Sequence, residues 1–410
     1  MPEVVPRPSI SARARAAANT AICLLKVFPM LPSRPVDWVT PRPVVEKVRY
    51  RTSHGDAEGD LYRPSSRGPY PGPYPGVVVC LGVVPFGVDH PQIPRLGEAL
   101  ARSGFAALLY WSPAMRDFRL DPADVDDIAS AYAALLDRPD VDPARSGLLG
   151  TCVGGAFALM AASHPRIRSR VNFVLAYAAY ASMWSLTRDI ASAAQSRDGQ
   201  RVAWAVDPLT RKVFVHTVTA FLEPAEAELL RGVYADRHAE TEPAGLSEAG
   251  RSVLPLLTAL DPDQADIALQ RLPRLMRERL DAMSPASYVP QIHAPQVILL
   301  HDRDDVVIPV GESRRLRDEL APTGRVRYTE FTVFKHLDPT KGKPSPIALA
   351  RELVRFGRAI YPLFEASSGL GRRSSAPHRA GLGEEARGCS RLMARCWRRL
   401  LHSHSGLPCP

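Results

Sequence analysis

Continuous apolar runs alternate with amphipathic segments along most of this chain, and this alternation limits the possible folds more than any other feature. A strand buried on one face alternates apolar and polar residues, whereas an unbroken apolar run indicates a strand covered on both faces. Segments with helical spacing separate the runs and supply that cover. The order predicts an α/β fold with a mostly parallel central sheet and flanking helices. The apolar runs lie at 77–82, 105–111, 146–151, 171–177 and 296–301.

The same pattern divides the 410 residues into four regions. Residues 1–43 are predicted to form an N-terminal helix followed by a Pro-rich connector. Residues 44–181 and 286–365 carry the alternating strands and helices of one core. Residues 182–285 lose the strand pattern and are predicted to be a helical insertion between two strands of the same sheet. Residues 366–410, rich in Ser, Gly and Arg, are expected to be disordered.

The net charge of +9 raises the question of a nucleic-acid partner. Residues 366–410 contain eight Arg against two Glu, so most of the excess positive charge lies there. A small surplus spread over the remaining chain does not make a phosphate-binding stripe. We therefore expect no nucleic-acid partner.

The segment 16–31 is apolar and follows Arg13 and Arg15, as in a targeting or membrane segment. Lys26 and Pro29 interrupt it, and its uncharged run is shorter than the ~20 residues that span a bilayer. We expect a helix packed on the protein body, with contact to a membrane surface as the weaker alternative.

The cysteines indicate the compartment. Only two of the six, Cys80 and Cys152, fall inside the predicted core, so no disulfide framework is expected and a reducing, cytoplasmic location is predicted. The Cys and His residues of 366–410 fit no common zinc spacing. We therefore predict no metal and no cofactor.

The segment GTCVGG at 150–155 places Cys152 between a predicted strand and a predicted helix. One interpretation is a small buried residue in a tight turn. The other is a nucleophile, because side chains two residues before and two after it, at Gly150 and Gly154, would clash in a strained strand-to-helix turn. The helix N-terminus would favour a thiolate, and the N–H of Val153 could stabilise an oxyanion.

With this motif in this place, the chain resembles the α/β-hydrolases, and more narrowly the dienelactone hydrolase branch, whose turn carries Cys in the pattern G-x-C-x-G-G. The resemblance covers residues ~44 to 364. It implies the α/β-hydrolase fold with an inserted helical cap over the site. It also implies a triad in which the acid and then the histidine follow the nucleophile in the chain.

The segment ILLHDRDDVVIP at 298–309 resembles the family's H-G-x-x-D-x-x-V-P turn and implies that Asp305 is the acid. Asp302 stands where the family has Gly, and Asp302 and Asp304 remain alternatives. The histidine implied by the order is His336, the one histidine in the loop after the last predicted strand. In the implied triad Cys152 attacks a carbonyl carbon, His336 transfers the proton, and Asp305 orients the imidazole.

A second oxyanion N–H is expected from the loop at 83–92. The hydrolase pattern, with Leu81 where His is usual, implies Val83, whereas the dienelactone pattern implies Pro85, which has no N–H. We adopt Val83 beside Val153. Val84 replaces the Glu of the dienelactone branch, so the resemblance leaves the substrate open. His90 either faces the pocket or is a surface residue.

These residues predict an enzyme that hydrolyses a small-molecule ester or lactone, or a thioester, through a Cys-His-Asp triad and an acyl-enzyme. An acyltransferase of the polyhydroxyalkanoate synthase type, with the same triad, is the first alternative. A catalytically inactive hydrolase fold that serves as a binding module is the second. Four aromatic residues of the insertion are candidates for an acyl pocket or for the core of the insertion: Trp184, Trp204, Phe214 and Phe221.

Overall fold

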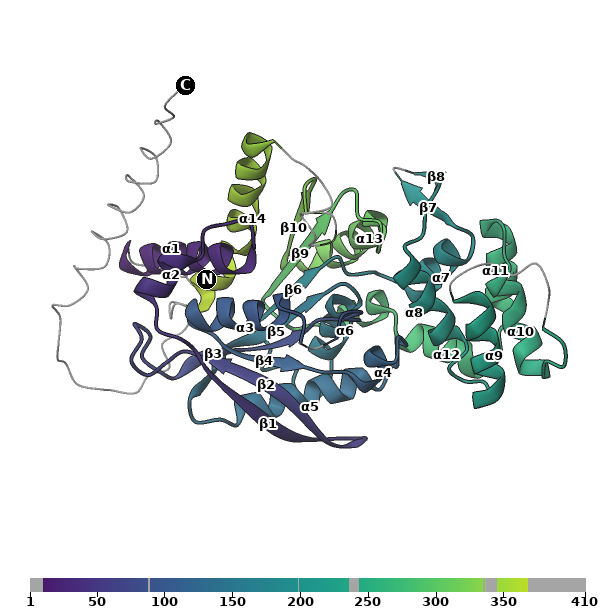
Figure 1. Ribbon diagram of the computed structural model, residues 1–410, viewed down its shortest axis with the longest axis horizontal. Helices are drawn as coiled ribbons and strands as arrows, with labels where there is room; N and C mark the ends of the chain where they lie inside the picture. Colours follow the sequence, from purple (N-terminus) through teal and green to yellow (C-terminus); the bar gives the residue numbers. More distant parts are fainter. Residues whose placement is uncertain are drawn as a thin grey trace, which may run out of the picture. The chain divides into compact units, whose positions relative to one another are not determined.

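The computed structural model describes residues 10–87, 89–197, 199–235, 243–334, 336 and 345–367. Its centre is an eight-stranded sheet in the order β1-β2-β4-β3-β5-β6-β9-β10 (Figure 1). The strands are β1 (Val44–Thr52), β2 (Gly55–Arg63), β3 (Tyr74–Cys80), β4 (Ala106–Tyr110), β5 (Val141–Thr151), β6 (Phe173–Tyr177), β9 (Gln296–Asp302) and β10 (Val326–Phe331).

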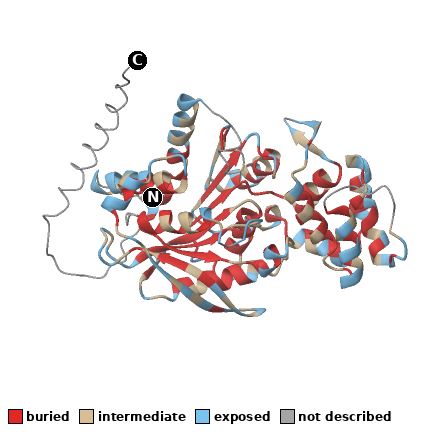
Figure 2. Cartoon of the chain, viewed as in Figure 1, coloured by how far each residue is buried: buried red, intermediate tan, exposed pale blue. Residues whose placement is uncertain are grey.

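The sheet is parallel except at β2, which pairs antiparallel with both β1 and β4. The hairpin of β1 and β2 carries charged side chains and is partly exposed, whereas every residue of β3, β4 and β6 is buried. In β3, Val78 and Val79 pack into different apolar clusters because successive side chains leave opposite faces of the sheet. The continuous apolar runs of the sequence are therefore strands covered on both sides (Figure 2).

Two layers of helices provide this cover. On one face, α3 (Gln92–Arg102) and α14 (Pro346–Ser367) pack with α1 (Ile10–Val27). On the other face lie α5 (Asp124–Leu136), α6 (Val153–Ala162) and α13 (Val310–Leu320). Outside the 183–282 region there are also the short α-helices α2 (Arg34–Val39) and α4 (Pro113–Arg116) and the 3-10 helices η1 (Pro285–Gln291) and η2 (Ala321–Thr323). Helix α2 lies within the predicted Pro-rich connector, with Pro35 in its first turn, where a missing N–H costs no hydrogen bond.

Between β6 and β9 the chain leaves the sheet and forms a separate group of helices, called the helical block here (Figure 1). Its members are α7 (Met183–Ala191), α8 (Pro208–Val218), α9 (Pro224–Tyr234), α10 (Glu248–Leu257), α11 (Pro262–Arg271) and α12 (Arg274–Ala282). It also contains a small hairpin of β7 (Ala194–Arg197) and β8 (Gln200–Ala203), which the sequence pattern did not predict. The hairpin strands have four residues each, mostly polar and exposed or half-buried, so they leave no apolar alternation to detect.

The N-terminal helix α1 packs against α3 and α14. Its buried Cys23 and the following Phe28 join the apolar cluster on that face of the sheet. Among the described residues, no helix is both long and apolar enough to cross a bilayer. The predicted disorder of 366–410 concerns residues that lie, apart from 366 and 367, outside the described part of the chain.

Candidate active site

Cys152 occupies a sharp turn between β5 and α6. Strand β5 ends at Thr151, α6 begins at Val153, and Cys152 between them has φ 56° and ψ −136°. A non-glycine residue in this region carries backbone strain of the order of 1–3 kcal/mol and persists only where its surroundings enforce it. Its N–H donates to Tyr177 O at 2.8 Å, which holds the turn against the neighbouring strand.

Glycines make the turn possible by close packing of backbone on backbone. A Cβ on Gly150 would run into the carbonyl of Gly154, and a Cβ on Gly154 would run into Cys80 O and Gly82 N. Gly82, with φ +75°, brings the loop after β3 against this turn. The two positions that the sequence analysis identified therefore have no room for a side chain.

The strand order, the helical cover and this strand-turn-helix at the carboxyl end of β5 decide the architecture. The molecule has the α/β-hydrolase fold. The fold class predicted from the sequence is confirmed, including a helical insertion between β6 and β9.

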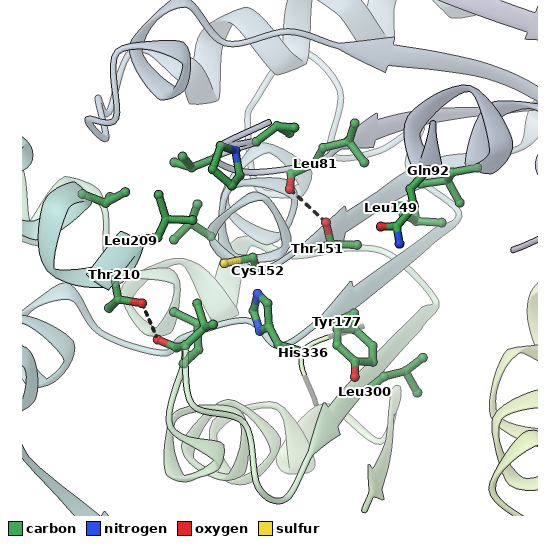
Figure 3. A pocket seen from close by; sticks show the side chains of 18 of the residues that line it. Leu81, Gln92, Leu149, Thr151, Cys152, Tyr177, Leu209, Thr210, Leu300 and His336 are labelled. Atoms are coloured by element: carbon green, nitrogen blue, oxygen red, sulfur yellow. Dashed lines mark hydrogen bonds between the residues drawn. The ribbon is translucent and has the colours of Figure 1, made fainter. Parts of the chain in front are cut away.

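The structure brings Cys152, His336 and Asp305 together from three separate elements. His336 Nδ1 lies 2.7 Å from Asp305 Oδ2. The remaining nitrogen of the ring is left for Cys152, whose sulfur contributes to raising the pKa of His336. In Figure 3 the imidazole lies beside the sulfur at the edge of the pocket. The three side chains thus lie in the order sulfur, imidazole, carboxylate, which is the order that nucleophilic catalysis requires.

Asp305 is held in the turn after β9 by more than its histidine. Its Oδ1 accepts hydrogen bonds from the N–H groups of Val307 (2.8 Å) and Ile308 (3.0 Å). Burial by itself would raise the pKa of this carboxyl, but His336, His301 and the N–H of Ile308 together keep the pKa below its ordinary value. Asp305 is therefore a fixed carboxylate, suited to orient one imidazole tautomer.

His336 lies between two groups that favour its charged form. Burial would lower the pKa of the imidazole, but the Asp305 carboxylate and the Cys152 sulfur raise it well above its ordinary value. An imidazolium held here would stabilise a thiolate beside it, which is the reactive form of cysteine. The backbone of His336 is itself in the left-handed region, with φ 61°.

The structure distinguishes among the three aspartates of this turn. Asp302 is buried and accepts hydrogen bonds from the N–H groups of Asp304 (3.0 Å) and Phe334 (2.7 Å). It ties the loop of His336 to the end of β9. Asp304 is exposed and pairs with Arg197 at 3.2 Å. Of the three, the carboxylate that contacts His336 is Asp305.

His301 belongs to this site, although the sequence analysis gave it no role. It is fully buried, with Nδ1 2.6 Å from Ser313 Oγ and Nε2 3.0 Å from Ile308 O. Its Nε2 also lies 3.5 Å from Asp305 Oδ2, and burial lowers the pKa of the ring. His301 therefore packs behind the carboxylate and supports it. A histidine four residues before the predicted acid was the available signal.

The two predicted oxyanion residues, Val153 and Val83, both line the pocket next to Cys152. Val153 is the first residue of α6, so its N–H has no partner within the helix. Thr151 Oγ1 donates to Leu81 O at 2.9 Å and ties the loop that carries Val83 to the turn (Figure 3). Their function as oxyanion donors remains a prediction. His90 also lines the pocket, where its ring lies 5.0 Å from that of Phe86.

Cys152 and His336 open into a cavity of about 790 Å³. Its size lies within the range of about 300–1,000 Å³ that is usual for small-molecule sites. Of the four aromatic candidates in the helical block, Phe214 lines the cavity. The indole N–H of Trp184 donates to Asp281 Oδ1 at 2.6 Å, and that of Trp204 donates to Val306 O at 3.2 Å. Phe221 packs against the apolar core.

Within the described part of the chain, no three His, Cys, Asp or Glu side chains are grouped as a metal ion would need. Cys23, Cys80 and Cys152 are free thiols.

No protein-family model matches the chain, and no curated protein does either. Solved structures with similar architecture include an acylaminoacyl peptidase of Pyrococcus horikoshii (14% identity, TM-score 0.47), with 82% of this chain and 43% of that chain covered. Another is DcsB in complex with its substrate analogue (15% identity, TM-score 0.47), with 79% of this chain and 100% of that chain covered. A third is a puromycin-hydrolysing peptidase of Mycobacterium tuberculosis (18% identity, TM-score 0.46), with 82% of this chain and 41% of that chain covered. The chain thus spans less than half of either peptidase, and similarity at this level says nothing about substrate or reaction.

Proposed function

We propose that the protein is a hydrolase that cleaves a carboxylic ester or lactone through a covalent acyl-cysteine. The observation that carries the proposal is the position of His336, which lies 2.7 Å from Asp305 Oδ2 on one side and beside the sulfur of Cys152 on the other. A structural cysteine in a tight turn would have no use for this arrangement. Nor would it need a strained backbone at a cavity wall.

The reaction has two balanced halves. Cys152 Sγ, its proton transferred to His336, attacks the carbonyl carbon and forms a C–S bond. The C–O bond to the alcohol then breaks, and the alcohol leaves with the proton from His336. Water next loses a proton to His336 and attacks the thioester carbon. The C–S bond breaks, the acid is released, and the proton returns to the sulfur.

The surrounding groups lower the barrier of both halves. The N–H of Val153, and that of Val83, are the donors for the oxyanion of each tetrahedral intermediate. One such donor is worth about 3 kcal/mol in other enzymes of this kind. Asp305 stabilises the imidazolium that forms in each half. The helical block would act as the cap that keeps bulk water from the acyl-enzyme.

The narrower assignment to a dienelactone hydrolase is not part of this proposal. Val84 lines the pocket where that branch carries a Glu near the nucleophile, so the acidic group typical of that branch is missing from this position. An open ester or an uncharged lactone suits the apolar lining better. The connected triad also argues against an inactive binding module, because a protein that only binds has no need of an oriented imidazole.

Hydrolysis of p-nitrophenyl esters by the purified protein tests the proposal. Cys152→Ala should abolish turnover, whereas Cys80→Ala, a buried thiol that lies outside the pocket lining, should retain it. Comparable turnover by wild type and Cys152→Ala would refute the mechanism. Addition of an alcohol as a competing acceptor separates hydrolysis from acyl transfer, since a transferase would release the new ester in preference to the acid.

A further inference from the structure

The cavity extends from Cys152 in two directions, which we name the sheet arm and the block arm. The sheet arm runs between the central sheet and helices α1, α3 and α14. The block arm runs between α7 and α8 of the helical block. Sheet-arm residues include Cys23, Phe28, Leu96, Leu149, Leu300 and Phe364. Block-arm residues include Leu186, Thr187, Leu209, Thr210, Phe214 and Thr217.

The two arms lie on opposite sides of Cys152. Leu149 and Phe364 belong to the apolar cluster under α3 and α14. Leu186 and Phe214 belong to the other cluster, which includes the α5 and α6 side. Figure 3 shows Leu209 and Thr210 on one side of the sulfur, and Leu149 and Leu300 on the other. A bound ester would therefore place one half in each arm, with its carbonyl at Cys152.

The sheet arm is lined almost wholly by apolar side chains. Leu149, Leu300 and Phe364 are buried, and Cys23 of α1 and Phe28, directly after α1, close the arm. The ring of Phe28 stacks on Phe334 with 5.0 Å between centroids, which fixes this wall. A long apolar space without charged groups favours a hydrocarbon chain and disfavours polar or charged substituents.

The block arm, by contrast, carries hydroxyl groups among its apolar residues. Thr210 Oγ1 donates to Val307 O at 3.2 Å, and Thr217 Oγ1 accepts from Leu120 N at 3.0 Å. Thr187 is fully buried, and its hydroxyl has no hydrogen-bond partner among the described residues. A buried hydroxyl without a partner is costly unless a ligand satisfies it. This arm therefore suits a group that carries its own polar atoms.

We propose that the substrate is an ester or thioester with a long, unbranched acyl chain, held in the sheet arm. Its alcohol or thiol part occupies the block arm and offers a polar atom to Thr187. This inference rests on the proposed function. The acyl part stays bound to Cys152 through the covalent intermediate, and the apolar sheet arm stabilises it there. The alcohol or thiol must leave and water must take its place, and the hydroxyl groups of the block arm suit both of these polar molecules.

Two leucines provide matched variants, because Leu96 and Leu209 are both half-buried and line opposite arms. In the Cys152→Ala background, which cannot turn over, dodecanoate binding is measured by titration calorimetry. We expect Leu96→Trp to weaken dodecanoate binding at least tenfold and Leu209→Trp to change it less than threefold. Leu96→Phe, a milder obstruction, should give an intermediate loss and covers the case in which Leu96→Trp fails to fold.

The active protein gives the second readout. The ratio of kcat/KM for p-nitrophenyl dodecanoate to that for the acetate should exceed ten, and Leu96→Trp should lower this ratio at least tenfold. No binding of dodecanoate to Cys152→Ala, or an equal effect of the two tryptophans, overturns the inference. Binding of dodecanoate with no ester turnover would instead reject the proposed hydrolysis and leave the acyl site standing.

Discussion

His336 Nδ1 lies 2.7 Å from the buried Oδ2 of Asp305, although 31 residues separate them in the sequence. The contact depends on two loops that leave neighbouring parallel strands, β9 and β10, at the same edge of the sheet. Asp302 reinforces it, since its carboxylate accepts the N–H of Phe334 two residues before the histidine. The position of the imidazole is therefore set by the two carboxylates of the turn after β9.

Asp305→Asn should leave the fold in place and lower kcat for ester hydrolysis by about 10⁴, because the amide no longer favours the required imidazole tautomer. Asp304→Asn is the matched control. Its carboxylate is exposed and pairs with Arg197, so kcat should stay within about twofold of wild type, as expected for a screened surface pair. A similar loss in both variants would show that the turn as a whole, and not the contact to His336, matters.

The raised pKa of His336 links stability to pH. A group whose pKa is higher in the folded state stabilises the fold fully below its unfolded pKa, about 6.5, and loses this contribution as pH rises through the folded value. The free energy of unfolding of wild type relative to His336→Gln should therefore decrease from pH 6 to pH 9. Urea unfolding of both proteins across this range measures it. A difference that stays constant or increases would contradict the assigned direction.

Glu312 is expected to fix the start of the helical block. Its fully buried carboxylate accepts the N–H groups of Ala181 (2.9 Å) and Ser182 (3.2 Å) and pairs with Arg315 at 2.6 Å. Glu312→Ala leaves these donors unsatisfied and should lower the free energy of unfolding by about 3 kcal/mol. Glu278→Ala, which removes an exposed helix pair, should cost less than about 0.5 kcal/mol. Thermal or urea unfolding compares the two, and equal losses would reject this role.

Gly154→Ala should disrupt the turn at Cys152. The added methyl group meets the backbone at Cys80 and Gly82, which cannot move aside without shifting β3 and the loop after it. We expect a loss of at least ~2 kcal/mol in stability together with loss of turnover. Gly232→Ala, in α9 with nothing within 4 Å of the new Cβ, should instead stabilise by about 0.5–1 kcal/mol. A harmless Gly154→Ala would mean that the turn is less crowded than described.

The central sheet could be predicted from the sequence because its strands are buried on both faces, which leaves unbroken apolar runs such as 77–82. The choice of Asp305 and His336 came from the resemblance to the α/β-hydrolases, whose chain order places the acid and the histidine after the last strands, and the structure brings both residues to Cys152.

Other features had no signal of this kind. The hairpin at Ala194–Ala203 is short and polar. The role of His301 depends on its packing against Asp305, for which the only signal in the sequence is a histidine four residues before the acid. The two-armed cavity arises where α1, α14 and the helical block meet the sheet, a tertiary arrangement that residue periodicity does not encode.

Mass spectrometry of the intact protein, acid-quenched during turnover of p-nitrophenyl dodecanoate, tests the central claim most directly. The account predicts a mass increase equal to one dodecanoyl group, located by peptide mapping at Cys152 and absent from Cys152→Ala. Rapid release of product with no acyl group on Cys152, or with the group on another residue, would contradict it.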